Sequence, residues 1–383
     1  MVKRMSELEK YELEIPDYES DEQGLFEEPV MEEPFNPNDI NIIPKQDTLI
    51  NLIDRLKNEE IDMNTGFQRH ADLWDLGKMS RLIESILIRF PLPAFYFDAT
   101  DDDNWLVVDG LQRLSSIRKF VVEYDDSLKL KLRGLEYLKE FNGLTYEELP
   151  RTYKRRIAEC PVTLFLIQPS TPDEVKYSIF RRINTGGMVL TNQEIRNAMA
   201  KPALREYLEN LANDEYLKKT VGDQSKRMVD QELVLRFLAF YSMDYELNKN
   251  NITTFLDSMV KNLEKLNTKE LDKYQKIFHK AMNRCWIIFG DAAFEKVTEN
   301  GEPRRKRKNS TLFEVWTVAL AKLSDNQMKT LEDNRNLVLK KNQELMTNDN
   351  EYFRSITFST QKKEYFRIRH EKVNRLIQEV LNA

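Results

Sequence analysis

Apolar residues recur every three or four positions in two stretches near the start of the chain, and this spacing predicts two short helices. The first follows Thr48, whose side chain can cap it, and the second runs from Lys78 to Arg89. Pro91-Leu92-Pro93 should end the second helix, because proline lacks the backbone donor that a helix needs. Glu84 falls close to the apolar side of this helix, so we expect it to face the domain interior.

Shorter apolar runs predict strands between and after these helices. Two of them, Ala94–Phe97 and Trp105–Val108, are joined by an acidic loop. Leu128–Leu132 alternates between apolar and basic residues, as in a half-buried strand, and Val162–Ile167 is a continuous apolar run that suits a central strand. A helix should begin directly after the Trp105–Val108 strand, because apolar residues at helical spacing follow it.

The second half of the chain is dominated by helical patterns. Thr171 and Thr191 each precede an acidic residue by three positions, which is typical of a capped helix start. Beyond about residue 200 the pattern is almost wholly helical. We therefore predict an α+β protein with a small mixed-sheet domain at residues 41–200, followed by a mainly α-helical domain at residues 201–383.

The first forty residues differ from the rest in charge. They hold 13 acidic and 3 basic residues, whereas the remainder holds 51 acidic and 55 basic residues and is close to neutral. This acidic, proline-containing segment has too few apolar residues to order itself, so we predict a flexible arm at residues 1–40. Such an arm can be a solubilising tail, or it can dock on a partner or imitate DNA.

The cysteines and the longest apolar runs exclude several classes of protein. Cys160 and Cys285 are too few for a disulfide framework or a four-cysteine zinc site. No apolar run approaches the length needed to cross a bilayer, and the first residues lack an apolar signal segment. We expect no association with a membrane and a reduced, cytoplasmic setting.

The richest chemistry lies in Asp109-Gly110-Leu111-Gln112-Arg113, at the predicted junction of strand and helix. Gly110 lets a phosphate approach the backbone N–H groups of the helix start, and Arg113 can bind it with two parallel hydrogen bonds. Gln112 can donate a further hydrogen bond or orient a water, and Asp109 can hold Mg²⁺. The alternative is a simple turn in which Asp109 caps the helix and Arg113 forms a surface salt bridge.

Other polar residues stand among predicted core residues, where surface charges are seldom placed. They are Gln68, Arg69, Glu84, Arg182 and Asn184. If they converge on the junction, three arginines would surround a polyphosphate, with Asp109 and Glu84 beside a metal ion or a water.

Four motifs follow one another along the chain: Phe67-Gln68-Arg69, Leu82-Ile83-Glu84-Ser85-Ile86, Val107-Val108-Asp109-Gly110-Leu111-Gln112-Arg113-Leu114 and Phe180-Arg181-Arg182-Ile183-Asn184-Thr185-Gly186-Gly187. Taken in this order, they resemble the GmrSD-type restriction-enzyme N-terminal domain family over roughly residues 45 to 200. The resemblance implies a ParB/sulfiredoxin-like fold whose G-x-x-R turn binds nucleotide phosphates. It also implies nucleoside-triphosphate hydrolysis coupled to the sensing or cutting of modified phage DNA. The chain departs from the usual Asp-Gly-Gln-Gln-Arg of the family at Leu111.

The leading hypothesis is therefore a nucleotide-binding, triphosphate-hydrolysing component that regulates or senses in a bacterial anti-phage restriction system. Its catalytic candidates are Asp109, Gln112 and Glu84, and its cofactors are a nucleoside triphosphate and Mg²⁺. Many relatives carry a fused His-Asn-His nuclease, but His70, His279 and His370 are far apart in this sequence. We expect a separate nuclease or defence-system subunit to cut DNA, and self-association remains open.

One basic cluster lies in a predicted loop between helices of the second half, and consists of Arg304, Arg305, Lys306, Arg307 and Lys308. It is either a solvated loop or a contact to the phosphate backbone of DNA. The second reading supports an alternative function, a ParB-like DNA-binding module without triphosphatase activity that acts with a separate nuclease. A third alternative is a scaffold that positions a partner through the acidic arm.

Overall fold

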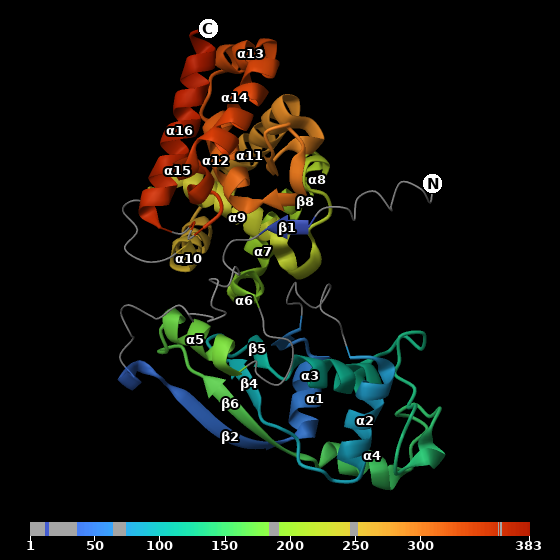
Figure 1. Cartoon of the computed structure of the whole chain (residues 1–383). Coiled ribbons are helices and arrows are strands. Elements are labelled where there is room, and N and C mark those ends of the chain that lie inside the picture. Colours follow the sequence, from blue (N-terminus) through green and yellow to red (C-terminus); the bar gives the residue numbers. More distant parts are fainter. Residues whose placement is uncertain are drawn as a thin grey trace. The chain divides into compact units, whose positions relative to one another are not determined.

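The computed structural model describes residues 12–14, 37–63, 74–183, 191–245, 252–358, 360 and 362–383. Contacts between residues divide the chain into two compact units. The first, here called the sheet unit, lies within residues 33–199, and the second, the helical unit, consists of residues 200–383 together with one short N-terminal strand (Figure 1).

A five-stranded mixed sheet forms the centre of the sheet unit. Its strands, in spatial order, are β2 (Ile42–Thr48), β6 (Pro161–Ile167), β4 (Phe95–Asp98), β5 (Trp105–Asp109) and β3 (Ile61–Asp62). Strand β6 pairs antiparallel with β2 and parallel with β4, while β5 pairs antiparallel with β4 and parallel with β3. The predicted strands at residues 94–97, 105–108 and 162–167 are confirmed, and the last is an interior strand.

Helices cover both faces of this sheet (Figure 1). On one face, Phe95, Val107 and Leu164 share a core with the helices α1 (Leu49–Lys57), α2 (Leu76–Leu87), α3 (Leu111–Ile117) and α4 (Arg151–Ala158). On the other face, Val108 and Ile167 pack with α5 (Asp173–Ile183) and α6 (Asn192–Met199). Val107 and Val108 therefore belong to different cores, as the alternation of side chains along a strand requires.

The predicted strand at Leu128–Leu132 is wrong. Among the described residues the segment pairs with no strand, because its backbone donors bind other carbonyls: Leu130 donates to Lys119, within the short helix Arg118–Val122, at 3.0 Å, and Leu132 donates to Leu144 at 3.0 Å. Leu130 and Leu132 are buried, so the alternation correctly indicated which side of the segment faces the core.

Helix α2 begins at Leu76, two residues earlier than predicted, because the Asp75 carboxylate caps it by accepting from the N–H groups of Gly77 at 2.8 Å and Lys78 at 2.9 Å. Thr48 precedes α1, as predicted, but its side chain makes no capping hydrogen bond.

The two predicted threonine caps have different outcomes. The Thr171 hydroxyl donates to the carbonyl of Asn41 at 3.0 Å and so fastens the start of β2. Its capping of α5 stays a prediction, because the side chains of Asp173 and Glu174 lie outside the described part. The capping box at Thr191 is confirmed: its hydroxyl accepts from the N–H of Glu194 at 3.1 Å, and its own N–H donates to that carboxylate at 2.7 Å.

The helical unit is almost wholly α-helical, as predicted. Its helices are α7 (Pro202–Ala212), α8 (Glu215–Val221), α9 (Val229–Ser242), α10 (Ile252–Leu263), α11 (Thr268–Phe289), α12 (Ser310–Ala321), α13 (Asp325–Asp333), α14 (Arg335–Asn348), α15 (Asn350–Ser355) and α16 (Lys363–Leu381). Eleven of the twelve residues of α12 and nine of the fourteen residues of α9 are buried, so these two helices form the centre of the unit. Among the described helices, none combines the length and apolar composition that crossing a bilayer demands.

A three-stranded sheet corrects two predictions. Its strands are β1 (Glu12–Glu14), β8 (Pro303–Asn309) and β7 (Glu295–Val297), with β8 in the middle. The basic cluster is therefore a strand and not a loop. Because Glu12 and Leu13 pair in parallel with Arg307 and Lys308, part of the predicted flexible arm is ordered on that strand.

Candidate functional site

The junction of β5 and α3 is built around a glycine that no other residue can replace without strain. Asp109 ends the strand, Gly110 has a φ of +102°, and the helix begins at Leu111. A Cβ atom on Gly110 would lie 2.4 Å from Cδ1 of Phe95. Glycine is thus required here both by the backbone conformation and by the close approach of an aromatic ring.

Arg113 points inward from α3 and binds the segment that enters β4. Its guanidinium donates to the carbonyls of Pro93 and, at 3.0 Å, Ala94, and it contacts the Asp109 carboxylate at 2.8 Å. It also lies 4.5 Å from the centre of the Phe95 ring, and its side chain is only 10% exposed. Burial lowers the pKa of Arg113 and the neighbouring Asp109 opposes this shift, but an arginine remains charged.

This arrangement matches neither of the two interpretations of Arg113 fully. The ion pair with Asp109 is present, but it is largely buried and not at the surface. Most of the guanidinium donors already have protein acceptors, so Arg113 holds the turn in shape and places positive charge behind it.

The outer side of the junction retains unused hydrogen-bonding groups. Helix α3 has no side-chain cap, and the N–H groups of Leu111, Gln112 and Arg113 have no acceptor among the described residues. One oxygen of the Asp109 carboxylate binds Arg113, while the other oxygen has no partner among the residues that the structure describes. The Asp109 side chain is 29% exposed. These groups are what an anion and a hydrated cation need.

Gln112 connects the junction to the segment before α2. Its side-chain oxygen accepts from the backbone N–H of Trp74 at 3.1 Å. This leaves the amide NH₂ of Gln112 without a partner among the described residues, so it can donate to a ligand.

Glu84 faces the interior, as predicted, but its carboxylate holds a loop. It accepts from the backbone N–H groups of Glu136 at 3.0 Å, Tyr137 at 2.7 Å and Leu138 at 2.8 Å. Burial alone would raise the pKa of Glu84, but the three donors together with Arg81 hold it below its ordinary value. No contact joins Glu84 to Asp109 within the described residues, so the structure assigns it to the loop and not to the junction.

The remaining predicted ligands cannot be placed at the junction. Gln68, Arg69 and Asn184 lie outside the described residues, and so does the side chain of Arg182, whose backbone belongs to α5. Their convergence with Arg113 stays a prediction.

The strand β8 separates the basic cluster into different environments. Lys308 is fully buried and pairs with Glu295 at 2.9 Å; burial lowers its pKa, and Glu295 opposes this. It is therefore unavailable to DNA in this conformation, whereas Arg307 is exposed. The side chains of Arg304, Arg305 and Lys306 lie outside the described part. A strand explains the contrast, because consecutive side chains point to opposite faces.

Two buried charged pairs could not be predicted from the sequence. Lys176 of α5 pairs with Asp98 at the end of β4 at 2.9 Å, and Arg369 of α16 pairs with Glu314 of α12 at 2.8 Å. Each pair joins residues far apart in the sequence, so neither spacing nor composition indicates it. Within the described residues, no group of three His, Cys, Asp or Glu side chains is placed to hold a metal ion.

Residues 49–201 match the family model described as "GmrSD restriction endonuclease, N-terminal domain". These residues form a GmrSD N-terminal domain. The match starts at the first residue of α1 and ends two residues after α6, so this GmrSD N-terminal domain includes the junction and four of the five strands of the sheet. The edge strand β2 precedes it. A search of curated proteins found no match to the chain. The domain indicates a restriction context for the protein.

Replacing Glu84 with glutamine should lower the free energy of unfolding by about 2 kcal/mol, because an amide cannot accept from all three donors and leaves a buried N–H unsatisfied. The pKa of Glu84 is lowered in the folded state, so its stabilising contribution is present above an unfolded pKa of about 4.3 and disappears as the pH falls through the folded value. Urea unfolding between neutral pH and pH 3 measures both effects.

Glu136→Gln is the matched control, because the Glu136 side chain is exposed and only its backbone contacts Glu84. A loss as large in this control, or a difference between wild type and Glu84→Gln that does not shrink as the pH falls, would contradict the assigned role of Glu84.

Proposed function

We propose that the protein is a nucleotide-binding and nucleotide-hydrolysing component that regulates or senses in a restriction system, and that a separate nuclease subunit cuts DNA. The GmrSD N-terminal domain supports the restriction context. The observation that carries the nucleotide proposal is the start of α3 after Gly110, which has no side-chain cap. It lies next to the Asp109 carboxylate, one oxygen of which has no partner among the described residues.

Phosphate binding at this junction relies on backbone donors. The N–H groups of residues 111–113 have no acceptor among the described residues, so they offer several hydrogen bonds to one anion, and the helix dipole adds partial positive charge. Arg113 contributes from behind: it fixes the turn and prevents Asp109 from presenting an uncompensated negative charge to the phosphate. The proposal thus gives Arg113 a positioning role and not the bidentate phosphate contact predicted from the sequence.

Asp109 is the residue that would hold Mg²⁺. Mg²⁺ in nucleotide sites is usually bound by one or two carboxylates together with substrate phosphates and water, so a single free carboxylate oxygen fits it. The ion would neutralise charge on the phosphates. Gln112, whose NH₂ is free, would donate to the nucleotide or orient a water.

Calorimetric titration with ATP, GTP, CTP and UTP, each with and without Mg²⁺, tests the proposal, together with an assay of phosphate release. We expect at least one triphosphate to bind, and Asp109→Asn to remove most of the Mg²⁺-dependent affinity, by about tenfold or more, because the amide is a poor ligand for this cation. Asp103→Asn, at an exposed position of the same domain, should change nothing. Absence of binding by every triphosphate would refute nucleotide recognition.

The alternative is a ParB-like DNA-binding module without hydrolysis. Among the described side chains of the basic cluster, Arg307 is the exposed one, so it is the residue that could contact DNA. Duplex DNA binding that Arg307→Ala weakens, without any nucleotide binding, would favour this alternative over the proposal.

A further inference from the structure

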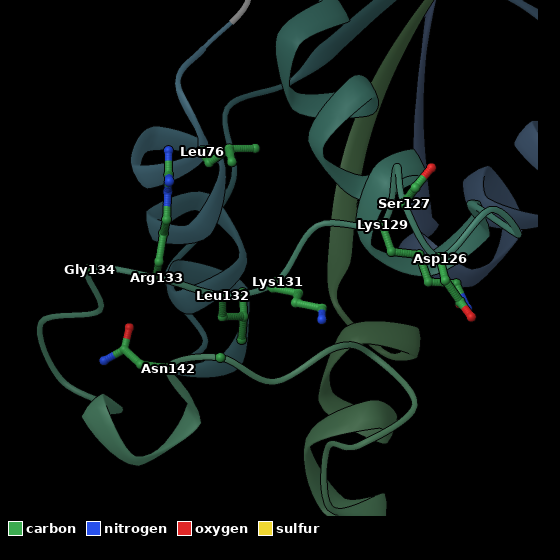
Figure 2. A pocket seen from close by; sticks show the side chains of 10 residues that line it. Leu76, Asp126, Ser127, Lys129, Lys131, Leu132, Arg133, Gly134 and Asn142 are labelled. Atoms are coloured by element: carbon green, nitrogen blue, oxygen red, sulfur yellow. The ribbon is translucent and has the colours of Figure 1, made fainter.

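A surface hollow of about 770 Å³ lies in the sheet unit, away from the residues of the nucleotide proposal. Segment 126–134 forms one side of it, residues 142–143 another, and Leu76 at the start of α2 closes the end, as Figure 2 shows. The hollow is open to solvent, which distinguishes it from the enclosed pockets that bind small molecules.

The lining carries three basic side chains and one acidic side chain, Asp126. Lys129, Lys131 and Arg133 stand on either side of the buried Leu130 and Leu132 in the sequence and line the hollow. Lys129 is paired with Asp126 at 2.9 Å and Glu147 at 3.4 Å. Lys131 and Arg133 are exposed, and neither forms an ion pair with any described residue. In Figure 2 Arg133 extends along α2 toward Leu76.

The backbone of this segment is held in place by several contacts, so it loses little conformational freedom when a ligand binds. Leu130 and Leu132 are buried in the core, and the N–H of Arg133 donates to the Ser80 hydroxyl at 3.1 Å. The loop that follows is held by its hydrogen bonds to the Glu84 carboxylate. The N–H groups of Lys131 and Gly134 have no acceptor within the described chain, so they add donors for an anion.

Exposed aromatic and aliphatic side chains gather in the same segments. Tyr124 is 80% exposed, Tyr137 66%, Leu128 60% and Leu76 40%. Within the described residues, these are four of the nine large hydrophobic side chains that are exposed. Tyr124 precedes and Tyr137 follows these cations in the chain, and a chain of unpaired bases needs both kinds of side chain, since its bases stack on aromatic rings and its phosphates bind lysine and arginine.

We propose that this groove binds a single-stranded segment of nucleic acid, with Lys131 and Arg133 contacting phosphates and Tyr137 stacking on a base. Bases in a duplex are already stacked on each other and are not offered to tyrosine, so a single strand is the occupant that uses all of these features. The groove shares no lining residue with the Asp109–Arg113 junction, so the inference does not depend on nucleotide binding.

Fluorescence anisotropy with the full chain and a labelled oligothymidylate of about 12 nucleotides tests the inference. Lys131→Ala/Arg133→Ala should weaken binding by about tenfold near 0.1 M salt and reduce the slope of log affinity against log salt by about 1.4, since two phosphate contacts disappear. Tyr137→Ala should weaken binding by about tenfold with an unchanged salt slope, because stacking releases no counterions. Both sites are exposed, so the variants should fold, as circular dichroism verifies.

The double variant Lys45→Ala/Arg155→Ala is the control, because it removes the same charge from exposed positions of the same unit that do not line the groove. Wild-type affinity in this control supports the inference. Failure of the wild type to bind the oligomer, equal losses in the two double variants, or a preference for a hairpin duplex or for polyglutamate would overturn it. Binding measured without nucleotide keeps the result separate from that of the proposed triphosphate site.

Discussion

Replacing Glu314 with glutamine should cost the helical unit about 3 to 5 kcal/mol of stability, as is typical when one partner of a buried ion pair is removed. The Glu314 side chain is 1% exposed and accepts from Nε of Arg369 at 3.0 Å and from its NH₂ group at 2.8 Å, with Nε2 of His370 at 3.3 Å. Burial alone would raise the pKa of Glu314, but Arg369 and His370 hold it below its ordinary value. The neutral variant leaves the Arg369 guanidinium buried without its counterion.

Hydrogen–deuterium exchange of α12 and α16, together with urea unfolding, measures this loss and locates it. Glu215→Gln makes the same chemical change in an exposed ion pair with Lys219 and should leave the stability almost unchanged, because water screens this pair. The double variant Glu314→Leu/Arg369→Met removes both charges and should recover most of the stability. If it were no more stable than Glu314→Gln, the loss would come from packing and not from the uncompensated charge.

Local signals in the sequence predicted most of the elements that position the junction. Helices α1 and α2 follow from their apolar spacing, and strands β5 and β6 from their apolar runs. The segment 128–132 shows the limit of this reasoning. Its alternation has the period of a strand, but whether it pairs depends on neighbours elsewhere in the chain, and the N–H groups of Leu130 and Leu132 donate to the carbonyls of Lys119 and Leu144 instead.

The orientation of charged side chains was harder to predict than their positions. The sequence places Gly110 and Arg113 next to each other, but only the fold brings the carbonyls of Pro93 and Ala94 within reach of the guanidinium. Glu84 was predicted to face the interior, and it does. The N–H groups that donate to its carboxylate, however, belong to residues about fifty positions later in the chain. A pattern along the chain indicates burial, whereas the partner of a buried charge is a property of the tertiary structure.

The two proposed binding surfaces depend on such internal charges in the same way. Arg113 fixes the turn that precedes the N–H groups of residues 111–113, and Glu84 fixes the loop that carries Tyr137. In both places a buried charge that binds no ligand shapes the backbone that would bind one. Variants of Arg113 or Glu84 are therefore poor tests of ligand contact, because they would disturb the surface itself.

Substituting Gly110 with alanine should lower the free energy of unfolding by about 2 to 5 kcal/mol, since two costs add. A residue with a Cβ pays roughly 1 to 2 kcal/mol in the left-handed region, and a Cβ placed 2.4 Å from the Phe95 ring adds about 1 to 3 kcal/mol of overpacking. Gly134→Ala separates the two costs, because Gly134 has a φ of +64° but no atom within 4 Å of its added Cβ, so only the strain of about 1 kcal/mol remains. Urea unfolding of both variants gives the difference directly. Equal losses in the two would show that the Phe95 ring moves aside freely, and the turn would then be too soft to hold its N–H groups ready for a phosphate.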